Sequence, residues 1–360
     1  MQPGRWIATG IMLIGLPPAG VLLRGGSLDP YLEFPPRTAF IDHAPFSWTA
    51  FALIAALVAL SAAPLVKGLL RPDPAETAPP TLRPFPWWGW AGLVLGAGAW
   101  ILAWTRFPWF AAWQPHTFPL LWGAFILVAN ALTLRRTGSC PMTGRPGYFA
   151  ALFPASAAFW WCFEYLNRFV QNWHYSGSDY PPATYFLLAT LSFATVLPAV
   201  LSVRAWLASF PRVHAILRGR RLPAAALTPA AAKGALAAGG AGLLLAGAAP
   251  NYGFPFLWLS PLVIVAAFQV REGHCPMLEA ARRGAWGSLA AVVLAGLVCG
   301  FFWEMWNYYS LARWCYTVPF VDRWHLFEMP LLGYAGYLPF GLECALIGDA
   351  IRGGPARRGS

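Results

Sequence analysis

The sequence predicts an all-α polytopic transmembrane helix bundle, with about ten membrane spans and almost no soluble domain. Three observations lead to this fold class. Hydrophobic residues make up 58% of the 360 residues and charged residues only 11%, less than half of the charged share that a soluble globule uses to cover its surface. The apolar residues fall in long continuous runs, and most Lys and Arg residues fall between those runs.

Each predicted span is an apolar run close to the length that a bilayer requires, which is about 20 residues. Because the runs are continuous and do not alternate every second residue, they favour helices over the strands of a membrane barrel. The ten predicted spans cover residues 6–23, 47–66, 87–104, 118–134, 149–170, 185–207, 231–249, 254–270, 286–306 and 326–348.

The basic residues predict the orientation of the chain. With the N-terminus placed in the cytoplasm, most of the 25 Lys and Arg residues fall on the inner side. The outer side receives only Arg24, Arg37, Arg106, Arg168, Arg313 and Arg323. Cytoplasmic loops carry the excess of Lys and Arg in membrane proteins, so the pattern predicts an even number of spans with both termini cytoplasmic. We therefore expect a multi-pass protein of a bacterial cytoplasmic (inner) membrane.

The net charge of +11 is spread over the connections and forms no single basic block. Scattered basic residues between spans contact anionic lipid headgroups. The expected partners are membrane lipids and a hydrophobic small molecule, not nucleic acid. The oligomeric state is left open.

An internal repeat relates two parts of the chain. The segment FWWCFEYLNR at 159–168 resembles FFWEMWNYYS at 301–310. This alignment places Glu164 on Glu304, and Asn167 on Asn307.

Two further matches flank this motif in the same order. SCPM at 139–142 matches HCPM at 274–277, and Trp173-His174-Tyr175 matches Trp314-Cys315-Tyr316. The sequence thus predicts an N-terminal helix pair in residues 1–70, followed by four-helix repeats at 87–207 and 231–348. Because each repeat has an even number of spans, the repeats would be parallel and related by an axis along the membrane normal.

Four carboxylates fall inside predicted spans: Glu164, Glu304, Glu328 and Glu343. A carboxylate at a helix centre costs roughly 2.5–3.5 kcal/mol on insertion scales, and such residues usually mark functional sites. The topology places the first three in the outer half of the membrane, with Glu328 near the start of the last helix. These three are the candidate catalytic acids, while Glu343 lies closer to the inner side and is a candidate for substrate binding.

Polar and aromatic residues near the same level complete the candidate site. Glu164 and Asn167 are three residues apart and share one helix face, as do Glu304 and Asn307. The candidate substrate-binding residues are Asn167, Asn307, Trp303, Tyr308, Trp173, Tyr175, Trp314, Tyr316 and Glu343. Aromatic rings here can line a pocket that stabilises a cation or a polyene, or they can form the aromatic belt of a membrane protein.

A structural role is the alternative for the repeated Glu and Asn pair. These residues can hydrogen-bond across the interface between the repeats, because polar side chains also join transmembrane helices. Arg168 can also neutralise Glu164 in a simple ion pair. No spacing typical of a metal site or a nucleotide-binding loop occurs, so we expect no metal and no cofactor.

The segments FFWEMWNYYS and FEMPLLGYAGYLPFGLEC (within 296–348) resemble a family of bacterial polytopic membrane proteins, a likeness that implies no particular activity. More faintly, the chain resembles the membrane-embedded lycopene cyclase type. That group also has tandem helical repeats, outer tryptophans and tyrosines, and a motif of Pro followed by two acids. Here the motif reads Glu328-Met329-Pro330. This resemblance implies an isoprenoid substrate.

Three functions follow as hypotheses. The first is an intramembrane enzyme that performs acid–base chemistry on a lipid or isoprenoid, with Glu304 or Glu328 as the proton donor. The second is a transporter or lipid-handling protein with its site between the repeats. The third is a membrane scaffold or accessory subunit in which the polar residues only pack helices.

Overall fold

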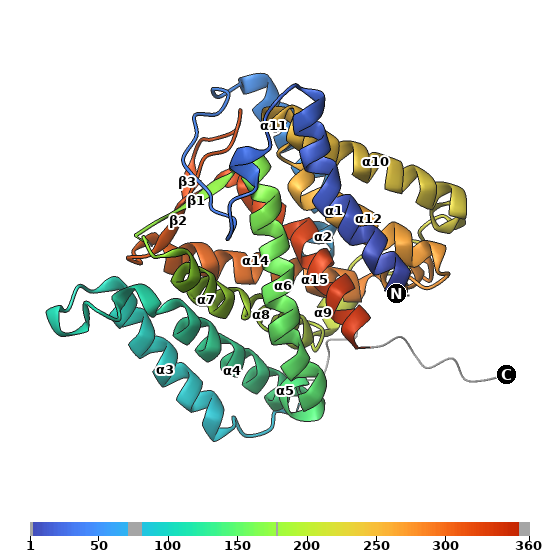
Figure 1. Cartoon of the computed structure of the whole chain (residues 1–360). Helices are drawn as coiled ribbons and strands as arrows, with labels where there is room; N and C mark the ends of the chain where they lie inside the picture. Colours follow the sequence, from blue (N-terminus) through green and yellow to red (C-terminus); the bar gives the residue numbers. More distant parts are fainter. Residues whose placement is uncertain (1–2, 71–80, 178, 353–360) are drawn as a thin grey trace.

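The computed structural model describes residues 3–70, 81–177 and 179–352 and shows a mostly helical bundle (Figure 1). The long helices are α1 (Pro3–Leu23), α2 (Trp48–Leu70), α3 (Trp87–Trp104), α4 (Phe118–Thr137), α6 (Pro146–Val170), α7 (Pro182–Phe193), α8 (Val196–Leu207), α10 (Pro229–Ala248), α12 (Phe256–Arg271), α14 (Gly287–Tyr308) and α15 (Tyr337–Ile351). The all-α class is confirmed.

Short elements connect these helices. The short α-helices are α5 (Pro141–Gly144), α9 (Pro211–Ala215), α11 (Pro250–Gly253) and α13 (Pro276–Arg282). The 3₁₀ turns are η1 (Asp29–Tyr31), η3 (Pro108–Phe110), η4 (Gln114–His116), η5 (Ala224–Leu227) and η6 (Leu331–Gly336). The strands are β1 (Trp173–Ser176), β2 (Arg313–Tyr316), β3 (His325–Leu326) and β4 (Met329–Pro330).

Proline defines where many of these helices begin. It occupies the first helical position of α5, α6, α10 and α13, among others. The first helical residue needs no amide hydrogen within the helix, so the proline ring costs nothing there and sets the backbone angle in advance. The two Cys-Pro-Met segments singled out in the sequence therefore start α5 and α13, immediately before α6 and α14.

Among the residues that the structure describes, seven helical segments are long and apolar enough to cross a membrane, or eight if the bent α12–α13 pair is one span. The angle between α12 and α13 is 78°. The helices α3 and α6, also predicted as spans, have 18 and 25 residues but lie outside this set. The apolar helices are compatible with an integral membrane protein, and the count of ten spans stays a prediction.

The predicted span at 326–348 begins too early. Residues 325–330 form the β3–β4 hairpin, η6 follows, and α15 starts only at Tyr337. Phe327 has a left-handed backbone with φ of 59°, and Pro330 lacks an amide hydrogen, so neither residue continues a helix. Glu328 therefore lies in a hairpin turn and not near the start of the last helix.

Close helix contacts depend on glycine at two places. A Cβ atom at Gly20 of α1 or at Gly247 of α10 would collide with the backbone of the other helix. Gly296 of α14 and Gly341 of α15 approach each other in the same way. Small residues allow transmembrane helices to pack backbone against backbone.

The helix α2 differs from the tightly packed helices, because none of its residues is buried.

The β1 and β2 strands pair antiparallel at one end of the bundle, and α5 and α9 lie toward the other end (Figure 1). The register places Trp173 opposite Tyr316, His174 opposite Cys315 and Tyr175 opposite Trp314. The two matching tripeptides of the sequence thus pair directly with each other. The β1–β2 pair lies at the ends of α6 and α14, near Glu164 and Glu304.

Candidate functional site

Glu164 on α6 is fully buried, with no exposed surface. Its Oε1 atom accepts three hydrogen bonds: from the indole of Trp160 at 2.9 Å, the indole of Trp173 at 3.1 Å and the hydroxyl of Tyr175 at 2.6 Å. Its Oε2 atom is buried and has no hydrogen-bond partner. The two oxygens of one carboxyl group therefore have different environments.

Glu304 on α14 repeats this arrangement. It is also fully buried, and its Oε1 atom accepts hydrogen bonds from the hydroxyls of Tyr316 at 2.8 Å and Tyr337 at 2.5 Å. Its Oε2 atom is again buried without a partner. Trp303 is buried beside it and stacks on Tyr337, with 6.0 Å between ring centroids.

The two asparagines hold the strands that supply these donors. Asn167 donates from Nδ2 to the carbonyl of Trp173 at 2.8 Å and accepts from the amide of Asn172 at 2.7 Å. Asn307 donates to the carbonyl of Trp314 at 2.7 Å and accepts from its amide at 2.9 Å. Each asparagine side chain thus connects a helix end to the strand that follows it.

Aromatic rings enclose both carboxyl groups. Trp258 of α12 stacks on Phe163 and on Trp173, with ring centroids 5.1 and 5.6 Å apart. Phe340 of α15 contacts the rings of Trp160 and Trp303 at 5.7 and 5.8 Å. The enclosure therefore draws side chains from helices of both halves of the chain. It is apolar except for the phenol and indole donors.

The phenols outside the helices keep their protons at neutral pH. Burial raises the pKa of Tyr175 and of Tyr316 well above the ordinary value, because a phenolate in this enclosure would lose its hydration. Both hydroxyls therefore act as donors to the glutamates. Burial also lowers the pKa of His174, which lies between Trp173 and Tyr175.

Arg168 does not form the ion pair with Glu164 that the sequence allowed. Its guanidinium donates to the backbone carbonyls of Tyr31 and Glu33 in the connection between α1 and α2. Tyr31 also stacks on Phe169, with 4.6 Å between ring centroids. Arg168 thus holds this connection against the end of α6.

Within the described parts of the chain, no ion pair joins Glu164 or Glu304 to a cation.

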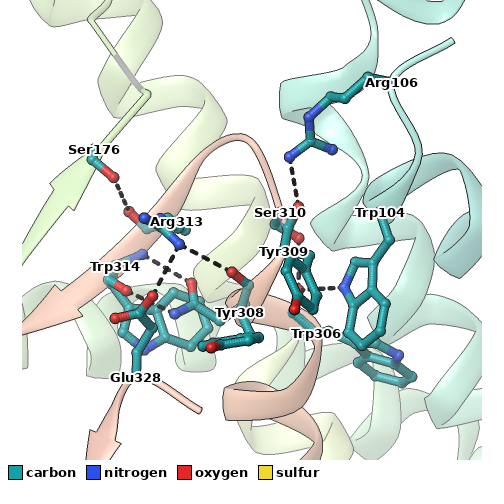
Figure 2. Close-up of polar contacts among 11 residues, drawn as sticks. Trp104, Arg106, Ser176, Trp306, Tyr308, Tyr309, Ser310, Arg313, Trp314 and Glu328 are labelled. Carbon is teal, nitrogen blue, oxygen red and sulfur yellow. Dashed lines mark hydrogen bonds and ion pairs between the residues drawn. The ribbon is translucent and has the colours of Figure 1, made fainter.

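Glu328 and Tyr308 lie in a different environment, near the surface. Glu328 pairs with Arg313 at 2.9 Å, and Arg313 also donates to the carbonyl of Tyr308 at 3.0 Å (Figure 2). The carboxylate of Glu328 is 22% exposed. The candidate acids are therefore of two kinds: two fully buried glutamates and one paired with a surface arginine.

Glu343 occupies a third environment. It is buried in α15, and its Oε1 atom accepts from the backbone amide of Leu262 at 2.9 Å. This amide follows Pro261, which lies inside α12. The Oε2 atom of Glu343 has no partner, like those of Glu164 and Glu304.

Two cavities occur near charged groups. One, of about 80 Å³, is lined by the ion-paired Arg204 and Asp349. The other, of about 390 Å³, is lined by Arg106, Arg313 and Tyr308 among others. Neither of these two cavities is lined by Glu164 or Glu304, and both glutamates are fully buried. No group of three or more His, Cys, Asp or Glu side chains suited to a metal ion occurs in residues 3–70, 81–177 and 179–352.

Sequence reasoning missed two elements of the site. Tyr337 donates to Glu304 and Trp258 covers Trp173, but both come from other helices and no local spacing connects them to the glutamates. The repeated Trp-x-Tyr tripeptides were the available signal for the donors Trp173, Tyr175 and Tyr316.

Comparisons with protein-family models, with curated proteins and with solved structures give no match for this chain. The arrangement of its own residues therefore carries the functional argument.

Proposed function

We propose that the protein is a ten-span bacterial inner-membrane protein with both termini in the cytoplasm, an N-terminal helix pair and two parallel four-helix repeats. The packing of helices supports the repeats. In residues 87–207, α4 packs on α3 and on α8, and α6 packs on α8; in residues 231–348, α12 packs on α10 and on α15, and α14 packs on α15. In the register of β1 and β2, Trp173 pairs with Tyr316 and Tyr175 pairs with Trp314. Each tryptophan of the repeated tripeptide therefore lies opposite the tyrosine of the other copy.

Within this frame, the protein acts as an intramembrane acid–base enzyme on a lipid or isoprenoid. One observation carries this proposal. Glu164 and Glu304 each accept side-chain hydrogen bonds at Oε1 alone, and each has a buried Oε2 without a partner among the described residues. A buried polar atom without a partner costs free energy in a purely structural site. The same atom is useful when it gives a proton to a substrate and takes one back.

The chemistry requires no co-reactant. The Oε2 hydroxyl of Glu304 or Glu164 donates its proton to a double bond of the substrate, which leaves a carboxylate and a carbocation. Aromatic faces around the site stabilise the cation, and the donors to Oε1 stabilise the carboxylate. A proton lost from a neighbouring substrate carbon returns to Oε2, so that the net reaction is an isomerisation or a cyclisation.

The other candidate residues support this chemistry from outside. Asn167 and Asn307 position the strands that carry the donors, and Trp303 is one face of the enclosure. Glu328 and Tyr308 lie near the surface, outside the aromatic rings that enclose Glu164 and Glu304.

The test compares the lipids of cells that express the wild type, Glu304→Gln, Glu164→Gln or Glu33→Gln. Glu33 is the matched control, because its carboxylate is 58% exposed and lies outside the site. We expect a hydrophobic product in wild-type and Glu33→Gln membranes, and about 100-fold less in at least one of the two site variants, the lower end for loss of a general acid. Indistinguishable lipid profiles from equal amounts of inserted protein would contradict the proposal.

A proton-coupled transporter is the second candidate, favoured by Glu343. This residue adds a third buried carboxyl group with an unpartnered oxygen, on α15 and six residues beyond Tyr337, the donor to Glu304. Chains of buried ionisable groups form proton relays in membrane transporters. Uptake into proteoliposomes that Glu343→Gln abolishes, without a new lipid product, would favour transport over catalysis.

A further inference from the structure

The cavity of about 390 Å³ lies between the connection that follows α3 and the one that joins α14 to β2. Arg106 comes from the connection after α3 (Figure 2). On the other side, Tyr308 ends α14, Tyr309 and Ser310 follow it, and Arg313 begins β2. Its volume falls within the range of small-molecule sites, which is about 300–1,000 Å³. The cavity is thus larger than a single ion requires.

Backbone carbonyls hold both guanidinium groups in place. Arg106 donates to the carbonyls of Ala103 at 3.0 Å and Tyr309 at 2.7 Å. Arg313 donates to the carbonyl of Tyr308 at 3.0 Å and to Glu328 at 2.9 Å. A guanidinium group has five N–H donors, so these contacts leave donors on each arginine for a ligand.

The charges around the cavity do not cancel. Arg313 has a carboxylate partner in Glu328, whereas Arg106 is bonded only to carbonyl oxygens in the part of the chain that the structure describes. Carbonyl oxygens orient a guanidinium group without neutralising it. The cavity therefore has an excess of positive charge and favours an anion.

Exposed aromatic residues on the same two connections indicate a position at a membrane interface. Trp109, Trp113 and Tyr309 are large aromatic residues with 71%, 65% and 55% of their surface exposed. Exposed tryptophan and tyrosine gather at the level of lipid headgroups. Trp104 orders the cavity wall, since its indole donates to the carbonyl of Trp306 at 3.3 Å and its ring contacts that of Tyr309.

We propose that this cavity binds a phosphate group, held by the guanidinium groups of Arg106 and Arg313, with a membrane phospholipid headgroup or free phosphate as its source. Arginine matches phosphate because its planar fork donates two parallel hydrogen bonds to two phosphate oxygens. The inference is independent of acid–base chemistry at Glu164 and Glu304, because no residue of those enclosures lines the cavity.

The experiment uses the full chain, purified in detergent, and measures lipid binding by native mass spectrometry. The probes are phosphatidylglycerol, which carries a phosphate, and diacylglycerol, which has the same tails without it. The proteins are the wild type, Arg106→Gln and Arg24→Gln. Arg24 is the matched control, because its side chain is exposed and, among the described residues, bonds only to the hydroxyl of Tyr31.

We expect Arg106→Gln to weaken phosphatidylglycerol binding by about tenfold or more, since one charge-assisted contact is lost, and Arg24→Gln to bind like the wild type. Inorganic phosphate at millimolar concentration then identifies the source: competition indicates free phosphate, and no competition indicates the lipid headgroup. Equal affinity for diacylglycerol would overturn the proposal, as would an Arg106→Gln variant, folded like the wild type, with unchanged affinity for both phosphatidylglycerol and inorganic phosphate.

Discussion

Asn167 offers the most direct test of how the strands are fixed over the buried glutamates. Its side chain is fully buried and bonds to two backbone groups, the carbonyl of Trp173 and the amide of Asn172. The substitution Asn167→Ala removes both partners at once. The strand that carries Trp173 and Tyr175 would then lose its connection to the end of α6, and it would keep its pairing with β2, its bonds to Glu164 and the stacking of Trp258 on Trp173.

The magnitude follows from the two backbone groups that lose their partner. Each buried group left unpaired costs about 1–3 kcal/mol. The lower half of the combined range applies, because β1 lies at the end of the bundle where water can reach a loosened strand. We expect a loss of about 3 kcal/mol, which corresponds to a roughly 100-fold loss of hydrogen-exchange protection.

Hydrogen exchange measured by mass spectrometry on the protein in nanodiscs checks this value for the peptide that contains the amide of Asn172. Ser192→Ala is the control variant, because within the described part of the chain the Ser192 hydroxyl donates to the carbonyl of Leu188 in its own helix and accepts from no backbone amide. Unchanged protection of residues 172–176 in Asn167→Ala would refute the reasoning.

Three further predictions concern other parts of the structure. Arg168→Ala should release the connection between α1 and α2, so that limited proteolysis cleaves it near Tyr31. Arg168→Lys should restore only part of the protection, because lysine lacks the planar guanidinium that donates to two carbonyls at once. Equal cleavage of the wild type and Arg168→Ala would disprove this role. Burial lowers the pKa of His174 below its ordinary value of 6.5, so the unfolded chain binds a proton first as the pH falls. Stability should therefore decline below about pH 6.5, and unfolding of His174→Gln should lack this part of the decline; an identical pH profile for both proteins would argue against it. Glu343→Ala removes the carboxyl acceptor of the Leu262 amide and should cost about 1–3 kcal/mol, whereas Glu343→Gln keeps an acceptor and should cost less. Equal melting temperatures for all three proteins would rule out a stabilising role for this contact.

The helical fold follows from the sequence because composition and run length dominate in a membrane. A long apolar run such as 231–249 has few alternatives to a helix, and the structure forms α10 there. The residues at which such helices begin and end are harder to predict than the helices themselves. The last span was placed too early because Leu326 and Phe327 extend the apolar run, while the left-handed backbone of Phe327 and the extended Pro330 break the helix.

The candidate site was predictable only where its contacts are local or repeated. Glu164 receives donors four, nine and eleven residues further along or back in the chain, from Trp160, Trp173 and Tyr175. The repeated tripeptides indicated two of these. Tyr337 reaches Glu304 from a different helix, and Arg168 binds a distant connection instead of the neighbouring Glu164. Such contacts depend on how helices pack, which no spacing in the sequence encodes.

Deuterium incorporation tests proton transfer by the buried glutamates most directly. The purified protein is supplied with lipid extract from cells that lack it, in deuterated water, and the hydrophobic products are analysed by mass spectrometry. Because Oε2 exchanges its proton with the solvent and then gives it to a substrate carbon, the wild type and Glu33→Gln should form a product that carries deuterium on carbon, and Glu304→Gln with Glu164→Gln should form none. A product without deuterium, or equal labelling by the double variant, would contradict acid–base catalysis by these two residues.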